Sequence, residues 1–102
     1  MTKNYNLNYD GFENYMVSER SLYDGVQYLF RFDNGYGASV VKHYGSYGHE
    51  DDLWELAVVH FPHEDSNDIF DLVYDTSVTD DVEGYLSDDD VVNLLSQIRD
   101  LS

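Results

Sequence analysis

The alternation of apolar and polar positions between residues 26 and 61 predicts the centre of a β-sheet. Between residues 26 and 33, aromatic and β-branched side chains recur at every second position, which is the period of a strand with one buried face. Asn34-Gly35 follows, and this dipeptide favours a two-residue type I′ turn because both residues tolerate positive φ angles. We therefore predict a hairpin whose return strand covers residues 36–43.

The turn also predicts the register of this hairpin. A two-residue turn places Phe32 opposite Gly37 and Phe30 opposite Ser39, so the aromatic row lies over small partners and Phe32 can lie across Gly37. Residues 53–61 form a third run, in which apolar side chains occupy both alternating sets of positions. This pattern is typical of a strand that is covered on both faces.

Weaker signals describe the segments around these strands. Residues 12–18 and 69–74 alternate enough to form further strands, whereas residues 19–25 contain turn signals and read as a loop. Residues 1–11 are rich in Asn and Tyr and end in a turn signal, so we expect a poorly ordered start.

One helix is predicted near the end of the chain. Ser87 is a suitable N-cap, and three aspartates follow in the first turn, where the helix dipole favours negative charge. Apolar residues then recur with helical spacing and form a single stripe that can cover one face of the sheet. The stripe consists of Val91, Leu94, Leu95, Ile98 and Leu101.

Before this helix, Thr79 can cap a short helical turn through residues 80–83, with Gly84 as the residue that ends it. Taken together, the elements predict an α+β fold. It is an antiparallel β-meander of three to five strands with a C-terminal α-helix packed on one face. We expect residues 1–102 to form a single domain.

The charge of the chain is its most unusual property. The 102 residues include 21 acids and 5 bases, which gives a formal net charge of −16. The acids are spread over the loops and the start of the predicted helix, a distribution that favours a folded acidic surface over a disordered acidic tail. Such a surface repels nucleic acid and anionic membranes and attracts basic proteins, although solubility or salt adaptation alone also accounts for it.

The sequence carries no sign of a disulfide framework or a membrane segment. It has no cysteine, and none of its apolar runs approaches the ~18 residues of a membrane span. The first residues lack the apolar stretch of a signal peptide, so we expect a cytoplasmic protein.

Four histidines invite comparison with metal sites. His43, His49, His60 and His63 do not match the ligand spacing of known zinc sites. The Asp-rich stretches lack the glycine and the terminal glutamate of a calcium loop. We predict no metal and no cofactor.

Catalysis has no motif to support it either. Glu55 and Asp71 could form a carboxylate pair across the third and fourth strands, but a carboxylate that is not buried is a poor base at neutral pH. The glycines lie in the hairpin and the following loop rather than before a helix, so none of them forms a phosphate-binding loop. We predict a protein that is not an enzyme.

Four segments resemble a family of small proteins of bacteriophages and prophages. They are residues 31–40 (RFDNGYGASV), 53–58 (LWELAV), 74–76 (YDT) and 79–86 (TDDVEGYL). The resemblance covers most of the chain and implies a phage-type context, and therefore a place in the host cytoplasm. It brings no function with it, but small acidic phage proteins are often inhibitors of host nucleic-acid enzymes, including anti-restriction and anti-CRISPR proteins.

Charge and resemblance together predict an acidic protein that binds and inhibits a basic nucleic-acid-binding host protein, with DNA mimicry as one mechanism. We expect no direct binding of nucleic acid or membranes. The predicted partner-binding residues are Tyr44, Tyr47, Glu50, Asp51, Asp52, Asp80, Asp81, Glu83, Asp88, Asp89 and Asp90.

The alternative is a structural or assembly protein of a phage. In this hypothesis exposed tyrosines and an open sheet edge bind a virion partner or a second copy of the chain, which would give a homodimer.

Overall fold

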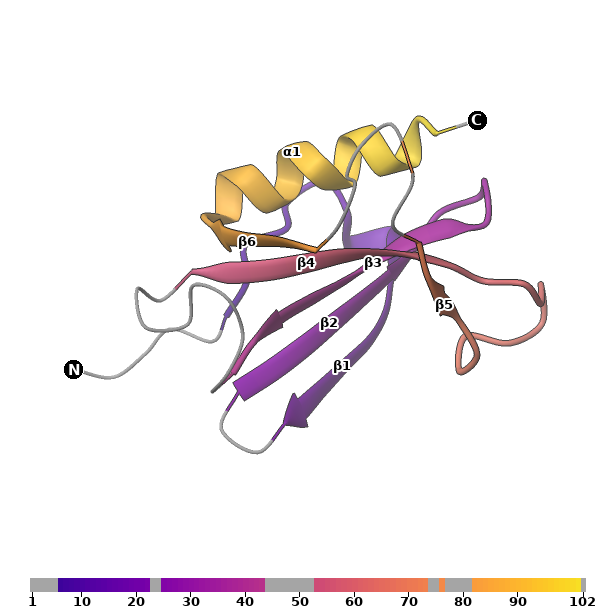
Figure 1. The fold of residues 1–102 in the computed structure, drawn as a ribbon, viewed down its shortest axis with the longest axis horizontal. Coiled ribbons are helices and arrows are strands. Elements are labelled where there is room, and N and C mark those ends of the chain that lie inside the picture. The colour runs from indigo at the N-terminus through magenta and orange to yellow at the C-terminus, as the bar shows by residue number, and fades with distance from the viewer. Residues whose placement is uncertain (1–5, 23–24, 44–52, 74–75, 77–81, 102) are drawn as a thin grey trace.

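The computed structural model describes residues 6–22, 25–43, 53–73, 76 and 82–101. Figure 1 shows the order of the elements along the chain. They are the 3₁₀ turn η1 (Glu13–Tyr15), the strands β1 (Met16–Leu22), β2 (Gly25–Arg31), β3 (Tyr36–Lys42), β4 (Trp54–His60), β5 (Asp71–Leu72) and β6 (Glu83–Leu86), and the helix α1 (Asp88–Arg99).

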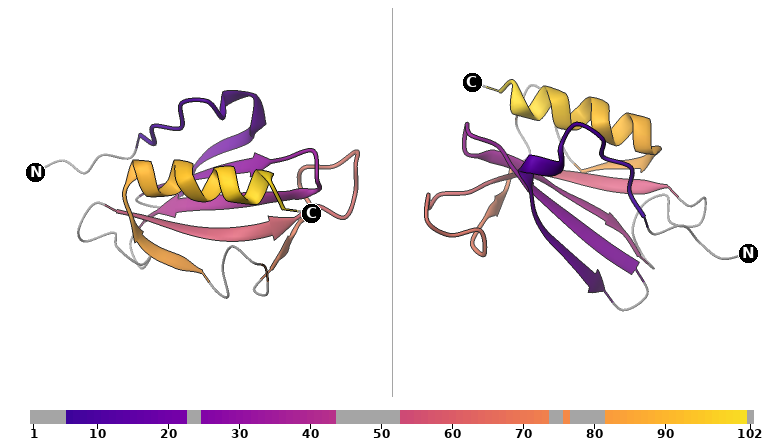
Figure 2. Two further views of the ribbon diagram at one scale, coloured as in Figure 1. Left: turned by 90° about the horizontal axis from the view of Figure 1, so that it is seen from above. Right: turned by 180° about the vertical axis from the view of Figure 1, so that it is seen from behind.

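The described strands form one antiparallel sheet. Its order is β1-β2-β3-β4-β5, and β6 pairs with β4 beside β5. Helix α1 and the segment that precedes β1 lie on the same face of this sheet (Figure 2). The prediction of an α+β fold with an antiparallel meander and a C-terminal helix on one face is therefore confirmed.

The main hydrophobic core lies between the sheet and α1. It receives alternate residues of the three central strands, because alternate side chains of a strand point to the same face. The helix contributes three residues of its apolar stripe, which are fully buried, while Leu94 and Leu101 pack at its margin. The core residues of the sheet and helix are Val26, Tyr28, Phe30, Phe32, Ala38, Val40, Trp54, Leu56, Val58, Leu86, Val91, Leu95 and Ile98.

The turn between β2 and β3 differs from the predicted type I′ turn. The Gly35 amide donates to the Phe32 carbonyl, the Phe32 amide donates to the Tyr36 carbonyl, and only Gly35 has a positive φ angle. This is a three-residue loop with a type I turn and a glycine bulge. Asn34 keeps a negative φ because its side chain is held on both sides: Oδ1 accepts from the Tyr36 amide, and the amide group binds α1.

The extra loop residue shifts the predicted register by one position. Phe30 lies opposite Ala38 rather than Ser39, and Arg31 rather than Phe32 lies opposite Gly37. Because a one-residue shift moves a strand's side chains to the other face, Gly37 lies away from α1, and the ring across it belongs to Phe61. A Cβ atom on Gly37 would lie 1.9 Å from the Phe30 carbonyl oxygen and 2.8 Å from Phe61 Cε2.

Strand β4 is covered on both faces at its C-terminal end, as predicted. On the face away from α1, Leu29, Val59 and Phe61 are buried together and Phe70 packs against them. The loop that follows β4 covers this smaller cluster through Phe70. β4 is therefore buried on both faces only at the end that this loop covers.

The first and fifth strands correct two sequence expectations. Residues 19–22 belong to β1 rather than to a loop, whereas residues 13–15 form a 3₁₀ turn. β1 is an edge strand with exposed polar side chains, which explains why its composition resembles that of a loop. Within the described part of the predicted strand at residues 69–74, only Asp71–Leu72 forms a strand, since Ile69 and Leu72 are about half exposed and provide no buried face; residue 74 lies outside the described residues.

Residues 6–11 pack on the sheet, although their composition suggested a poorly ordered start. Leu7 is buried and its amide donates to the Tyr28 hydroxyl over 3.4 Å. The Tyr9 ring lies 5.7 Å from the Tyr28 ring and 5.6 Å from the Phe30 ring. Burial raises the pKa of the Tyr28 hydroxyl, against a smaller lowering by the bond from Leu7, so Tyr28 acts here as a neutral core residue.

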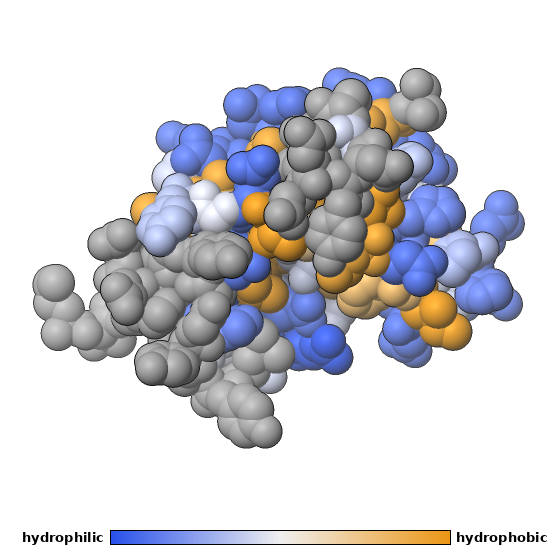
Figure 3. Space-filling view, in the orientation of Figure 1, coloured by the Kyte–Doolittle hydropathy of each residue, from blue (hydrophilic) through white to orange (hydrophobic). Residues whose placement is uncertain are grey.

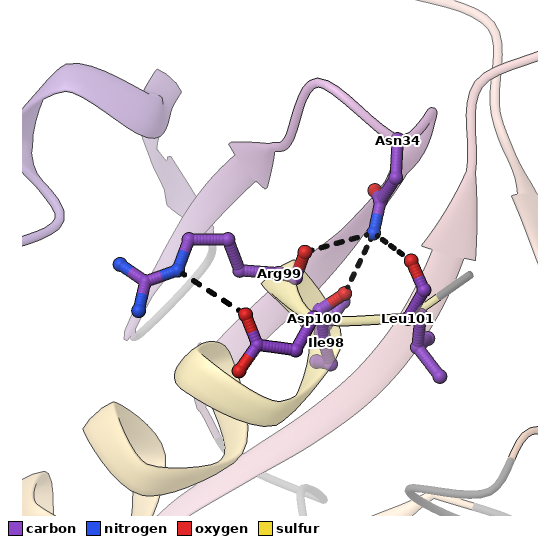
Figure 4. A network of polar contacts seen from close by, with 5 residues as sticks. All are labelled: Asn34, Ile98, Arg99, Asp100 and Leu101. Carbon is purple, nitrogen blue, oxygen red and sulfur yellow. Dashed lines mark hydrogen bonds and ion pairs between the residues drawn. The ribbon is translucent and has the colours of Figure 1, made fainter.

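The predicted helix cap is confirmed. Ser87 Oγ accepts from the Asp90 amide, and the Asp90 carboxylate accepts from the Ser87 amide, which completes a capping box. The other end of α1 is capped by the distant Asn34 (Figure 4). Its amide nitrogen donates to carbonyl oxygens at and just after the end of the helix, at 2.9 Å to Ile98, 3.1 Å to Arg99 and 2.9 Å to Leu101.

Within the described segments, α1 is the longest helix, and none is both long and apolar enough to cross a membrane.

Candidate binding surface

Arginine 31 uses its charge to hold a loop rather than to neutralise an acid. Its guanidinium lies 4.9 Å from the centroid of the Phe61 ring. Nη1 donates to the Ser66 carbonyl and to Asn67 Oδ1, both over 2.8 Å, and Nη2 donates to the His63 carbonyl over 2.9 Å. The loop after β4 is therefore fixed to the sheet, and Arg31 forms no ion pair with the acids of this loop.

The other described basic side chains differ in their exposure. Lys42 is buried, with Nζ 4.3 Å from the centroid of the Trp54 ring. Arg99 lies 5.2 Å from the Phe12 ring, and its Nε is 3.9 Å from Asp100 in an exposed ion pair, a type worth about 0–1 kcal/mol.

Arg20 remains on the surface and ends a polar ladder across three strands. Its Nε donates to Gln27 Oε1, and Gln27 Nε2 donates to Ser39 Oγ, both over 2.7 Å. The ladder orders the face of the sheet opposite α1.

Exposed acids outnumber exposed Lys and Arg side chains among the described residues. Figure 3 shows hydrophilic residues gathered over α1 and over the end of the molecule that carries the loop after β4. Apolar residues appear between these two regions. The exposed acids are Asp10, Glu13, Glu19, Asp33, Glu64, Asp65, Asp68, Asp71, Glu83, Asp89, Asp90 and Asp100.

The three aspartates in the first turn of α1 have different roles. Asp88 Oδ1 accepts a 2.8 Å hydrogen bond from Trp54 Nε1, so this carboxylate ties the helix to β4. Asp90 closes the capping box. Asp89 is exposed and has no hydrogen-bond partner among the described residues. Two of the three predicted partner-binding acids in this turn, Asp88 and Asp90, therefore form hydrogen bonds within the fold.

Glu83 lies in a strand, not in the capped helical turn that we predicted. It pairs with Leu56 of β4 as part of β6, and Gly84 does not have the positive φ of a helix-ending residue. Tyr85 has φ 59° and is 62% exposed, at a register shift in the β4–β6 pairing. Glu83, Tyr85 and Asp89 are exposed within seven positions of one another, and we call them the β6–α1 surface.

Sequence reasoning missed Tyr85, because a tyrosine in a short polar segment gives no signal of its backbone conformation. Seven predicted partner-binding residues lie outside the described residues. They are Tyr44, Tyr47, Glu50, Asp51, Asp52, Asp80 and Asp81.

The side chains considered as a catalytic pair or as metal ligands do not lie close together. Asp71 lies opposite His60 on β4, five positions from Glu55. At about 3.4 Å per residue the two carboxylates are roughly 17 Å apart along the strand. The His60 ring packs edge-on against Tyr36, with 5.2 Å between ring centroids. Within the described ranges, no three His, Cys, Asp or Glu side chains are grouped so that they could hold a metal ion.

No family model, no curated protein and no solved structure matches this chain. The resemblance to phage proteins therefore stays a prediction, and the functional argument rests on the structure and its charge.

Proposed function

We propose that this protein binds a basic protein through its acidic surface and competes there with nucleic acid. The phage-type inhibitor of a host nucleic-acid-binding protein is the most specific form of this proposal. It is a binding function and requires no catalytic group.

The observation that carries the proposal is charge density. The chain has 16 net negative charges, and its longest dimension is 40 Å. That is about one charge per 2.5 Å of axis, compared with one per ~1.7 Å for duplex DNA. Among the described Lys and Arg side chains, only Arg20 and Arg99 are exposed, since Lys42 is buried and Arg31 is half-buried.

The rigidity of the acids supports the same function. Ordering a mobile side chain or loop on binding costs about 0.5–1.5 kcal/mol per group. The acids of β6 and α1 stand on regular structure, and those of the loop after β4 stand on a segment that Arg31 fixes at three points. Both sets are held before a partner arrives.

A salt series tests the proposal directly. A basic nucleic-acid-binding protein should bind this chain at low salt, lose affinity steeply as sodium chloride increases, and be displaced by duplex DNA. Isothermal titration calorimetry and a fluorescence competition assay measure the two effects. An affinity that does not change between low and high ionic strength would contradict an electrostatic interface.

A pair of charge-reversal variants locates the interface. Glu83→Lys combined with Asp89→Lys changes the β6–α1 surface without touching the Trp54 bond or the capping box. Asp10→Lys combined with Glu19→Lys makes the same change in charge elsewhere. If the β6–α1 surface is the contact, the first pair weakens partner binding much more than the second, while circular dichroism stays native. Equal effects would assign binding to the overall field.

Tyr85 provides an uncharged test of the same surface. A non-glycine residue in the left-handed region costs about 1–2 kcal/mol, which Tyr85→Gly relieves. We expect Tyr85→Gly to be as stable as the wild type or more so in urea denaturation, and to bind the partner less tightly. A variant that is more stable and binds normally would remove Tyr85 from the interface.

The edge of β1 favours a second candidate function, namely assembly. Among the described strands, β1 has a neighbour on one side only, and Val17 on it is 37% exposed. An open edge is a template for pairing with another strand. Analytical ultracentrifugation across the same salt series separates the two functions. Self-association of a chain with a charge of −16 strengthens with salt, whereas binding to a basic partner weakens.

A further inference from the structure

A depression of about 640 Å³ lies at the end of the sheet, between the β2–β3 turn and the loop after β4. Figure 1 shows these two segments at the same end of the molecule. Asp33, Asn34 and Gly35 line the depression from the turn, and Glu64 and Asn67 line it from the loop. Phe61 and Arg31 lie between them.

Both sides of this depression are fixed by the residues that line it. On one side Asn34 binds the end of α1 through its amide group, and the Gly35 carbonyl accepts a 2.8 Å bond from the Phe61 amide. On the other side Arg31 holds the loop at His63, Ser66 and Asn67. The cavity therefore exists before any ligand binds, which removes an ordering cost from binding.

The charges of the depression favour a cation. Asp33 lines it from the turn and Glu64 from the loop, and each is exposed with no hydrogen-bond or ion-pair partner among the described residues. Arg31 is the one guanidinium in the lining, and its donors are directed to the carbonyl oxygens of the loop. The two carboxylates carry more negative charge than the single Arg31 offsets. The depression therefore has a local excess of negative charge, within a chain that is itself strongly acidic.

We propose that this depression binds one basic side chain, an arginine or a lysine, between Asp33 and Glu64. The inference rests on the proposed function for the source of that side chain, which is the basic partner. An entering ammonium or guanidinium group donates to both carboxylates, and its methylene stem lies along the exposed Pro62. The site thus adds a specific contact to an interface that is otherwise held by long-range charge.

A small-molecule titration tests the site without any partner protein. The probes are N-acetyl-arginine methylamide and N-acetyl-lysine methylamide, followed by ¹H–¹⁵N NMR. We expect saturable shifts concentrated at the Gly35 backbone amide and the Asn67 side-chain amide. N-acetyl-citrulline methylamide has nearly the shape of the arginine probe but no charge, and should produce no saturable shift.

Matched variants separate the site from the general field. Asp33→Asn combined with Glu64→Gln should weaken probe binding by about tenfold or more, since a hydrogen bond to a charged group contributes about 1.5–3 kcal/mol. Asp10→Asn combined with Glu19→Gln makes the same change in charge and residue type away from the depression, and should change affinity less than about twofold. All four residues are exposed, so both variants are expected to fold.

Three outcomes overturn the inference: shifts spread over the whole acidic surface, binding of the citrulline probe as strong as the arginine probe, or equal losses in the two variants. Partner binding distinguishes this failure from that of the proposed function. If Asp33→Asn/Glu64→Gln still binds a basic protein with the wild-type salt dependence, the acidic surface acts without this cavity. If the probes bind but no basic protein does, the cavity stands and the proposed function fails.

Discussion

Substitution of Asn34 offers the sharpest test of how the hairpin and the helix depend on each other. The Asn34 amide group has two hydrogens for three carbonyl oxygens, so at most two of the three contacts are full hydrogen bonds at one time. Oδ1 forms a third bond, with the Tyr36 amide over 2.9 Å. At a net ~1 kcal/mol per hydrogen bond, Asn34→Ala should lower the free energy of unfolding by about 3 kcal/mol.

Asn34→Asp separates the helix contact from the turn contact. Aspartate has nearly the same shape, suits the turn, and keeps the bond from Tyr36. It replaces the NH2 group, with its two donors, by one oxygen that faces three carbonyl oxygens at the negative end of the helix dipole. The lost bonds cost about 2 kcal/mol and the unfavourable charge up to about 2 kcal/mol more. We therefore expect Asn34→Asp to be less stable than Asn34→Ala by about 1 kcal/mol at pH 7.

The pH dependence supplies a second, independent check. A carboxylate among carbonyl oxygens is disfavoured in its charged form, so the pKa of this aspartate should be higher in the folded protein than in the unfolded chain. An acid of this kind loses stability as pH rises through its folded pKa and recovers it as pH falls. The difference between the two variants should therefore shrink or reverse near pH 4.

Urea denaturation at constant ionic strength, followed by the fluorescence of the buried Trp54, measures both effects. Wild-type stability of Asn34→Asp at pH 7 would refute the capping role. So would a difference between the variants that is the same at pH 7 and pH 4.

Three further predictions concern the same fold. Asp88→Ala should destabilise by about 1.5–3 kcal/mol in urea because it leaves Trp54 Nε1 without its charged partner, whereas Asp89→Ala should cost no more than about 1 kcal/mol; equal losses would mean that the Trp54 bond contributes nothing. Gly37→Ala should prevent native folding, seen as loss of near-ultraviolet circular dichroism, because its Cβ would lie 1.9 Å from the Phe30 carbonyl oxygen; a native spectrum would show that the two strands can separate locally. The melting temperature should rise with sodium chloride between low and moderate salt, since screening relieves the repulsion of a −16 chain, and a flat salt series would mean that this repulsion is already compensated.

Local patterns were sufficient for the parts of this protein that depend on one segment at a time. The period-2 alternation around Phe30 identified the central strands, and the capping chemistry of Ser87 with the stripe beginning at Val91 identified α1. These signals are local because the residues that bury one face of a strand, or that accept and donate the hydrogen bonds of one helix end, are close together in the sequence. The α+β class followed from them.

Contacts between distant segments decided the rest. Asn34-Gly35 is a good type I′ turn by itself, yet the helix end 64 positions away takes the Asn34 side chain and changes the turn and the register. In the sequence, Arg31 is simply a polar residue in an apolar strand. In the structure, it binds a loop more than 30 positions further along the chain.

The candidate sites divide in the same way. Net charge, and with it the proposal of a basic partner, is a property of composition and needed no structure. Which acids are available is a property of packing: Asp88 and Asp89 are neighbours in sequence, but only Asp88 meets the indole of Trp54. The depression between Asp33 and Glu64 joins two loops about 30 positions apart, and no local pattern encodes it. Sequence by itself therefore determined the central strands, the helix and the sign of the net charge, whereas the exposed acids and the cavity depend on side chains that meet only when the chain has folded.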